Sequence, residues 1–84
     1  MFYVYVTQNK DGEIYIGSTN NLERRISEHN SGASLSTKGS HWGLVYYEAY
    51  KSEEDARNRE HQLKYHGQAK RWLKERIRNS LKQS

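Results

Sequence analysis

Residues 2–17, FYVYVTQNKDGEIYIG, decide the fold of this chain. Two runs rich in β-branched and aromatic residues flank the turn signal NKDG, a pattern typical of an antiparallel β-hairpin. Side chains alternate between the two faces of a strand, so the length of the loop decides which of them share a face. Loops of two and of three residues therefore predict different hairpins.

A two-residue loop, Asp11-Gly12, would place Tyr5 and Tyr15 on opposite faces of the hairpin. A three-residue loop that also includes Lys10, with Gly12 in the left-handed conformation, pairs Tyr5 with Gly17 and puts both on the face of Tyr15. It gathers the apolar side chains on the other face: Phe2, Val4, Val6, Ile14 and Ile16. We prefer the three-residue loop because it separates the aliphatic side chains from the tyrosines.

A helix follows the hairpin. Asn20 and Glu23 resemble a capping box, which predicts a helix over about residues 21–30. On a period of 3.6 residues Arg25 and His29 lie at the edge of its inward face, whereas Arg24 points elsewhere. The Ser/Gly-rich segment 31–43 then predicts a long loop, and LVYYEAY at residues 44–50 predicts a third strand.

Two more helices are expected near the end of the chain. Ser52 and Asp55 form a second capping box, for a helix that runs to about His66 and ends at Gly67. The last helix, over about residues 68–81, carries an apolar stripe of Ala69, Trp72, Leu73, Ile77 and Leu81. The order is ββαβαα, an α+β fold in which helices flank a small three-stranded antiparallel sheet.

Length and composition limit the class of protein. With 84 residues we expect a single domain over residues 1–84. The chain has no cysteine, which excludes a disulfide scaffold and a thiolate metal site. It also has no signal peptide pattern and no apolar run of about 18 residues. We therefore expect a cytoplasmic protein that does not associate with membranes.

Charge is distributed unevenly along the chain. Residues 1–56 contain five basic and eight acidic residues, a net charge of −3, whereas residues 57–84 contain nine basic and two acidic residues, a net charge of +7. A basic segment of this kind suits a polyanion, most often nucleic acid. A solvated helix that only confers solubility would show the same charge.

Glu60 lies at an unexpected place in the predicted helix over residues 52–66. Ala56 and Leu63 mark the apolar stripe, and Glu60 falls between them. A carboxylate that faces a core is unfavourable unless it is paired or bound to a cation. A salt bridge to a nearby arginine, or a place at the edge of the stripe, explains Glu60 as well as a metal ion does.

Together these segments resemble the GIY-YIG nuclease domain, and the resemblance covers essentially the whole chain. YVY at residues 3–5 matches the first motif, with Tyr3 where the motif name has glycine, and YIG at residues 15–17 matches the second. NNLERRISEHN resembles the helix with the arginine and histidine of the family, and EDARNREHQLK the helix with its metal-binding glutamate. The small single-domain members are most similar in build.

The resemblance implies a metal-dependent endonuclease that hydrolyses phosphodiester bonds, in DNA more than RNA, with a link to repair or recombination. Glu60 would hold one Mg²⁺ or Mn²⁺, and Arg25 would bind the scissile phosphate. Tyr5 is the candidate that activates water, which requires the nearby cation or Arg25 to lower its pKa, and Tyr15 and His29 would orient the water or phosphate. Either tyrosine could be the base.

Further residues are expected to bind substrate: Gly17, Lys38, Lys70, Arg71 and Lys74. Gly17 would leave room for a backbone to come close, and the lysines and arginine would contact phosphates. No separate DNA-targeting domain is expected, so a protein partner could supply specificity, and activity could be slow or depend on that partner. The alternative is a non-catalytic or accessory nucleic-acid-binding module, for which Glu60 would be unfavourable beside phosphates.

Overall fold

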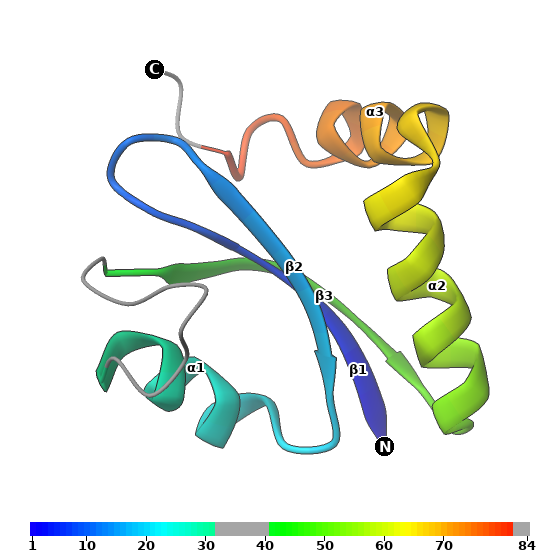
Figure 1. Ribbon diagram of the computed structural model, residues 1–84. Coiled ribbons are helices and arrows are strands. Elements are labelled where there is room, and N and C mark those ends of the chain that lie inside the picture. The colour runs from blue at the N-terminus through cyan, green and yellow to red at the C-terminus, as the bar shows by residue number, and fades with distance from the viewer. Residues whose placement is uncertain (32–40, 82–84) are drawn as a thin grey trace.

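The computed structural model describes residues 1–31 and 41–81, which form three strands and three helices in the predicted order ββαβαα (Figure 1). Lys38 lies outside the described residues. The strands are β1 (Phe2–Gln8), β2 (Ile14–Thr19) and β3 (Gly43–Tyr50). The helices are α1 (Leu22–Ser31), α2 (Glu53–Tyr65) and α3 (Gly67–Arg76).

The strands form one antiparallel sheet in the order β2-β1-β3. The hairpin has the three-residue loop: Tyr5 pairs with Gly17, and the amide of Asn9 donates to the carbonyl of Glu13 at 3.1 Å. Gly12 has a φ of 85°, the left-handed conformation that the loop requires. The predicted register is therefore confirmed, and Tyr5 and Tyr15 share a face.

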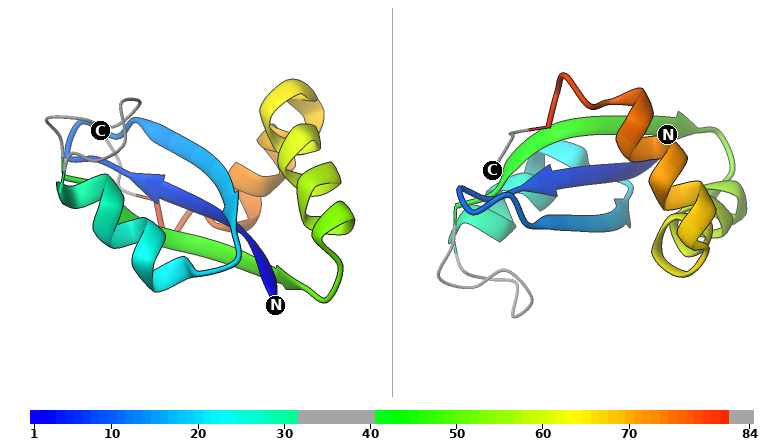
Figure 2. Two further views of the ribbon diagram at one scale, coloured as in Figure 1. Left: turned by 60° about the horizontal axis from the view of Figure 1, so that its bottom comes forward. Right: turned by 90° about the horizontal axis from the view of Figure 1, so that it is seen from above.

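The two faces of the sheet are covered by different helices (Figure 2). Val4 and Val6 of β1 pack against Leu63 of α2 and Leu73 of α3, which form the apolar core. On the other face Tyr5 contacts α1 through His29. The expected separation within the hairpin thus places the aliphatic core on one face of the sheet and Tyr5 and Tyr15 on the other.

The start of α1 differs from the prediction. The cap is Asn21 and not Asn20: Oδ1 of Asn21 accepts a hydrogen bond from the amide of Arg24 at 3.0 Å. The hydroxyl of Thr19, at the end of β2, accepts from the amide of Asn21 at 3.1 Å. Asn20 lies one residue too early for its side chain to reach the first free amides of the helix.

The two C-terminal helices also depart from the prediction at their ends. Ser52 caps α2 as expected, by accepting from the amide of Asp55. Gly67, however, is the first residue of α3 and does not end α2, since His66 in extended conformation separates the helices. α3 ends at Arg76, and Ile77 leaves helical geometry and is buried.

Trp72 does not belong to the buried stripe of α3, since 62% of it is exposed. Ala69 and Leu73, four residues apart, face the core. Trp72 precedes Leu73 by one residue, which is about 100° around the helix, so its side chain lies beside the buried stripe and reaches solvent. The expectation of a buried Trp72 was therefore wrong.

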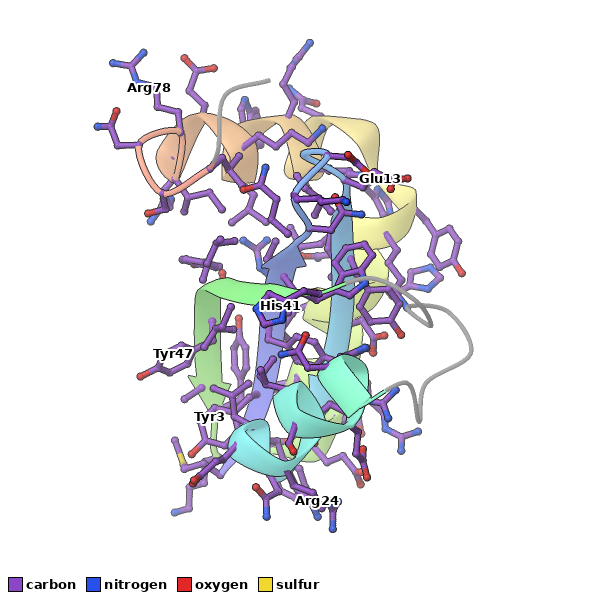
Figure 3. The ribbon with its side chains drawn as sticks, turned by 90° about the vertical axis from the view of Figure 1, so that its left-hand side faces the viewer. Tyr3, Glu13, Arg24, His41, Tyr47 and Arg78 are labelled. Carbon is purple, nitrogen blue, oxygen red and sulfur yellow. The ribbon has the colours of Figure 1, made fainter. Side chains whose placement is uncertain are left out.

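β3 is attached to α2 through Glu48. The hydroxyls of Tyr46 and Tyr50 donate to its two carboxylate oxygens, and Arg59 donates to both from Nε and Nη2 at 3.0 and 3.2 Å. Tyr3 and Tyr47 lie on the opposite face of the sheet, to one side of α1 (Figure 3).

Within the described residues, no helix has the length and apolar character needed to cross a bilayer.

Candidate active site

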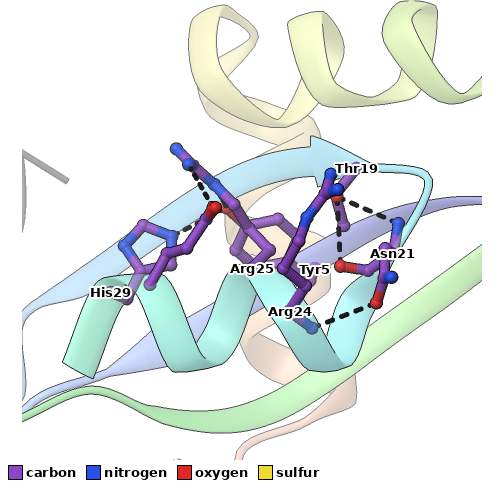
Figure 4. A network of polar contacts seen from close by, with 7 residues as sticks. Tyr5, Thr19, Asn21, Arg24, Arg25 and His29 are labelled. Carbon is purple, nitrogen blue, oxygen red and sulfur yellow. Dashed lines mark hydrogen bonds and ion pairs between the residues drawn. The ribbon is translucent and has the colours of Figure 1, made fainter. Parts of the chain in front are cut away.

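The hydroxyl of Tyr5 is held between two side chains of α1 (Figure 4). Nε of Arg25 donates to it at 3.3 Å, and it lies 2.8 Å from Nε2 of His29. Burial, and then the charge of Arg25, lower the pKa of His29 below its ordinary value, so the imidazole is neutral at pH 7. We therefore assign Nε2 as the acceptor of the Tyr5 proton.

Tyr15 completes the aromatic part of the site. Its ring centroid is 4.8 Å from that of His29 and 6.3 Å from that of Tyr5. Trp42, which is buried, packs edge-on against Tyr15 with a centroid distance of 6.3 Å. The amide of Trp42 donates to Oδ1 of Asn30 at 2.7 Å, which ties the start of β3 to the end of α1.

Gly17 makes room for Tyr5. A Cβ atom at this position would lie 2.5 Å from the hydroxyl oxygen of Tyr5 and 3.1 Å from Cε1 of Tyr15. From the sequence we expected that the space beside Gly17 would let a backbone come close. In the structure the phenol of Tyr5 lies in this space, so the missing side chain of Gly17 makes room for Tyr5.

Arg25 connects this cluster to solvent. Its side chain is 33% exposed, and Nη1 also donates to Glu28 at 3.1 Å. The hydrogen bond to Tyr5 raises the pKa of Arg25 despite burial, and the bonds to Glu28 and Tyr15 add to this effect. The guanidinium is thus a fixed positive charge between the two tyrosines and the surface.

Arg25 does not by itself bring the pKa of Tyr5 below its ordinary value. Burial raises it above its ordinary value, and Arg25 lowers it only in part. Tyr15 and the charge of Glu60 raise it further. Tyr5 and His29 are also fully buried. Loss of solvent thus outweighs the nearby guanidinium, so Arg25 alone does not give Tyr5 the lowered pKa expected for a base, and a cation at Glu60 would have to supply it.

Glu60 lies on α2, beyond the edge strand β2. Oε1 accepts from the hydroxyl of Ser18 at 2.7 Å, and Oε2 lies 2.9 Å from Nζ of Lys64. Burial favours the neutral acid, but the contacts with Ser18 and Lys64 prevail and lower the pKa of Glu60. Of the explanations left open for Glu60, a salt bridge is present, with a lysine instead of an arginine. Lys64 joins Glu60 to the tyrosines, since its Nζ lies 5.8 Å from the Tyr15 ring centroid.

Comparison with known proteins settles the family. The family profile of the GIY-YIG catalytic domain matches residues 1–74. The chain belongs to the GIY-YIG family. A UPF0213 protein of Clostridium perfringens is 42% identical over 66 residues, which cover 76% of this chain and 71% of that protein. A UPF0213 protein of Natronomonas pharaonis is 40% identical over 71 residues, covering 82% and 84%.

A solved structure agrees with this assignment. The solution NMR structure of a UPF0213 protein from Bacillus halodurans matches with a TM-score of 0.54 and 36% sequence identity. The match covers 87% of this chain and 81% of that one. The fold expected from the GIY-YIG resemblance is therefore confirmed, and membership of a nuclease family follows from the domain.

A divalent cation, which GIY-YIG nucleases generally use, is compatible with the surroundings of Glu60. The carboxylate is 22% exposed and ionised, and it borders a cavity of about 260 Å³ lined by Ser18, Arg57, Glu60, His61, Lys64 and Tyr65. No group of three His, Cys, Asp or Glu able to hold a metal occurs among the described residues. One carboxylate is enough for Mg²⁺ or Mn²⁺ when waters and substrate oxygens supply the other ligands.

A larger hollow, of about 600 Å³, lies on the other side of α1 between Leu22, Ile26, Tyr3 and Tyr47. Its described lining contains no Lys, Arg or His, and its one carboxylate is Glu23. Such a lining offers a phosphate neutral hydrogen-bond donors but no positive charge. The cluster around Tyr5, with Glu60 beside it, is therefore the candidate active site of this GIY-YIG domain.

The structure brings most of the site residues predicted from sequence together and places the basic residues of α3 elsewhere. Tyr5, Tyr15, Arg25 and His29 are in direct contact, Gly17 supports them, and Glu60 is joined to them through Lys64. Lys70, Arg71 and Lys74 lie on α3, whose Leu73 packs on the opposite face of the sheet from Tyr5.

Three contributors were missed: Ser18, Lys64 and Trp42. Lys64 could have been found, because a lysine four residues after a glutamate on a helix reaches its carboxylate. Ser18 follows Ile14 and Ile16 on the face of the sheet toward α2, so strand parity indicated it as well.

Proposed function

We propose that this protein is a metal-dependent endonuclease that hydrolyses phosphodiester bonds in DNA. The observation that supports the proposal best is the Tyr5 hydroxyl, which is held between the charged Arg25 and the neutral His29. A hydroxyl with a proton acceptor on one side and a fixed cation on the other suits proton transfer next to a phosphate.

In this proposal Arg25 turns from Tyr5 toward the scissile phosphate, where its planar guanidinium contacts the phosphate oxygens. Tyr5 takes a proton from the attacking water and passes its own proton to Nε2 of His29. The high pKa of Tyr5 favours this order, because the phenol loses its proton only as it gains another. Tyr15, which is less buried, is the alternative base.

Glu60 would hold the divalent cation, with Ser18 orienting the carboxylate through its hydrogen bond. When bound there, Mg²⁺ or Mn²⁺ would stabilise negative charge on the phosphate and on the leaving oxygen. Magnesium dependence, a role in DNA repair and a cytoplasmic location are parts of this proposal.

The basic residues of α3 would bind DNA away from the reacting phosphate. Lys70, Arg71 and Lys74 all lie within its ten residues, in the segment of the chain with the highest positive charge. Backbone contacts of this kind give affinity without sequence preference. We propose that a preference for branched or nicked DNA, or a protein partner, supplies specificity.

One observation favours the alternative, a binding module without activity. Tyr5 and His29 are fully buried, so substrate reaches the hydroxyl only if neighbouring groups move. Ionised Glu60 does not decide against this alternative, because the ammonium of Lys64 already offsets its charge toward DNA phosphates.

A panel of branched, nicked and linear DNA and RNA, incubated with Mg²⁺, Mn²⁺ or a chelator, tests the proposal. We expect cleavage of at least one DNA substrate with either metal and none with the chelator. DNA binding without any cleavage would instead support the binding module.

A further inference from the structure

Lys64 occupies a special place between the two parts of the candidate site. Its Nζ lies 2.9 Å from Oε2 of Glu60 and 5.8 Å from the centroid of the Tyr15 ring. The other oxygen of Glu60 accepts from Ser18. Both carboxylate oxygens therefore already have a hydrogen-bonding partner, and one of the partners is a cation.

Other cations near Glu60 are placed differently. Arg57 also lines the cavity beside Glu60, but its side chain is 70% exposed and its Nη2 contacts Glu53 at 3.2 Å. Arg25 contacts Tyr5 and Glu28. Among the described residues, Lys64 is the cation that forms an ion pair with Glu60.

We propose that the ammonium of Lys64 holds the cation position beside Glu60 in the metal-free protein, and that it must leave Glu60 for a divalent cation to bind there. This inference rests on the proposed role of Glu60 as the metal ligand. An ammonium and a divalent ion repel each other, and both need the same carboxylate oxygen, so they compete.

The competition has a consequence for substrate binding. Once released, the Lys64 side chain has four flexible methylene groups and can reach another anion, such as a phosphate of the nucleic acid. A phosphate that attracts Lys64 frees Glu60 for the metal, and a metal on Glu60 frees Lys64 for the phosphate. Because such coupling is reciprocal, metal and nucleic acid favour each other's binding.

Binding of Mn²⁺ to the protein without nucleic acid, followed by electron paramagnetic resonance, tests the inference. Lys64→Met removes the ammonium and keeps the length of the side chain, and Lys64→Gln is a second, polar variant. Lys10→Met, at an exposed position on the hairpin loop, is the control for the loss of one positive charge. Glu60→Gln in the Lys64→Met background shows whether the ion binds at Glu60, and circular dichroism checks that each variant is folded.

We expect both Lys64 variants to bind Mn²⁺ about two- to fivefold more tightly than wild type, the effect of removing a competing exposed ion pair. Lys10→Met should bind like wild type, and Glu60→Gln should abolish the gain. Equal or weaker binding by the Lys64 variants, or no binding by any protein, would overturn the inference.

The outcome separates the inference from the proposed function. Tighter Mn²⁺ binding by the Lys64 variants in a protein that cleaves nothing would support the inference and contradict the nuclease. A wild type that cleaves, with Lys64 variants whose Mn²⁺ affinity is unchanged, would do the reverse.

Discussion

The hydroxyl of Tyr5 on β1 lies 2.8 Å from Nε2 of His29 on α1, although 24 positions separate the two residues in the chain. Both side chains are fully buried, so the hydrogen bond between them replaces one that water would make with each in the unfolded chain. This contact fixes the position of α1 on the sheet, and it also places a proton acceptor against the phenol.

Gly17→Ala should displace Tyr5. The added Cβ would lie 2.5 Å from the Tyr5 hydroxyl, so we expect a loss of about 1–3 kcal/mol in the free energy of unfolding, as in overpacked cores. Urea denaturation measures this loss. Gly43→Ala is the control, because its Cβ would lie 4.0 Å from its nearest neighbour. Equal stability of the two variants would contradict the positioning role of Gly17.

Arg25→Ala should reduce cleavage by about 10²-fold or more, by analogy with the loss of one transition-state donor. DNA affinity should fall only modestly, because the basic residues of α3 remain. Single-turnover cleavage and equilibrium binding measure the two effects. The neighbouring Arg24, which is exposed, provides the control Arg24→Ala. Similar cleavage by both variants would be inconsistent with the role given to Arg25.

His29 should make stability dependent on pH. Its pKa is lowered in the folded state by burial and by Arg25, from 6.5. Below about pH 6.5 the unfolded chain therefore binds a proton that the folded protein does not. The contribution of His29 is constant above this pH, and stability declines as pH falls toward the lowered pKa, by at most about 1.4 kcal/mol per pH unit.

Urea denaturation at pH 7.5 and pH 5.5 measures this dependence. His29→Gln should show a smaller loss of stability between the two pH values than wild type, whatever its absolute stability. His61→Gln, at an exposed position, should behave like wild type. An unchanged pH dependence in His29→Gln would show that another group is responsible.

The positions of the catalytic candidates on β1, β2 and α1 could be predicted from sequence because they depend on local rules. Strand parity and the loop ending at Gly12 placed Tyr5, Tyr15 and Gly17 on one face. Helix phase placed Arg25 and His29 toward that face.

Features that depend on tertiary packing could not be predicted in the same way. The end of α3 at Arg76 and the exposure of Trp72 follow from how Leu73 and Ile77 meet the core. The raised pKa of Tyr5 follows from its complete burial, which neither spacing nor residue type reveals. Strand parity placed Ser18 on the face of the sheet toward α2, but it could not pair Ser18 with Glu60, because the two residues lie 42 positions apart.

Neutralising Lys70, Arg71 and Lys74 together should weaken DNA binding and make it less dependent on salt. Each phosphate contact releases counterions, so the slope of log affinity against log salt should fall by about 0.9 for each contact that is lost. Fluorescence anisotropy at several salt concentrations measures the slope. Lys10→Ala, on the hairpin loop, is the control. If affinity and slope stay unchanged, the charge of α3 serves solubility.

Glu60 is proposed to hold the metal ion on which cleavage depends. Cleavage of the preferred DNA substrate in Mg²⁺ should therefore be compared between wild type, Glu60→Gln and Glu54→Gln, which changes an exposed carboxylate at the start of the same helix. We predict that Glu60→Gln abolishes cleavage while its DNA affinity is equal or slightly higher, and that Glu54→Gln cleaves like wild type. Cleavage by Glu60→Gln at the rate of wild type would show that Glu60 does not hold a metal ion needed for cleavage.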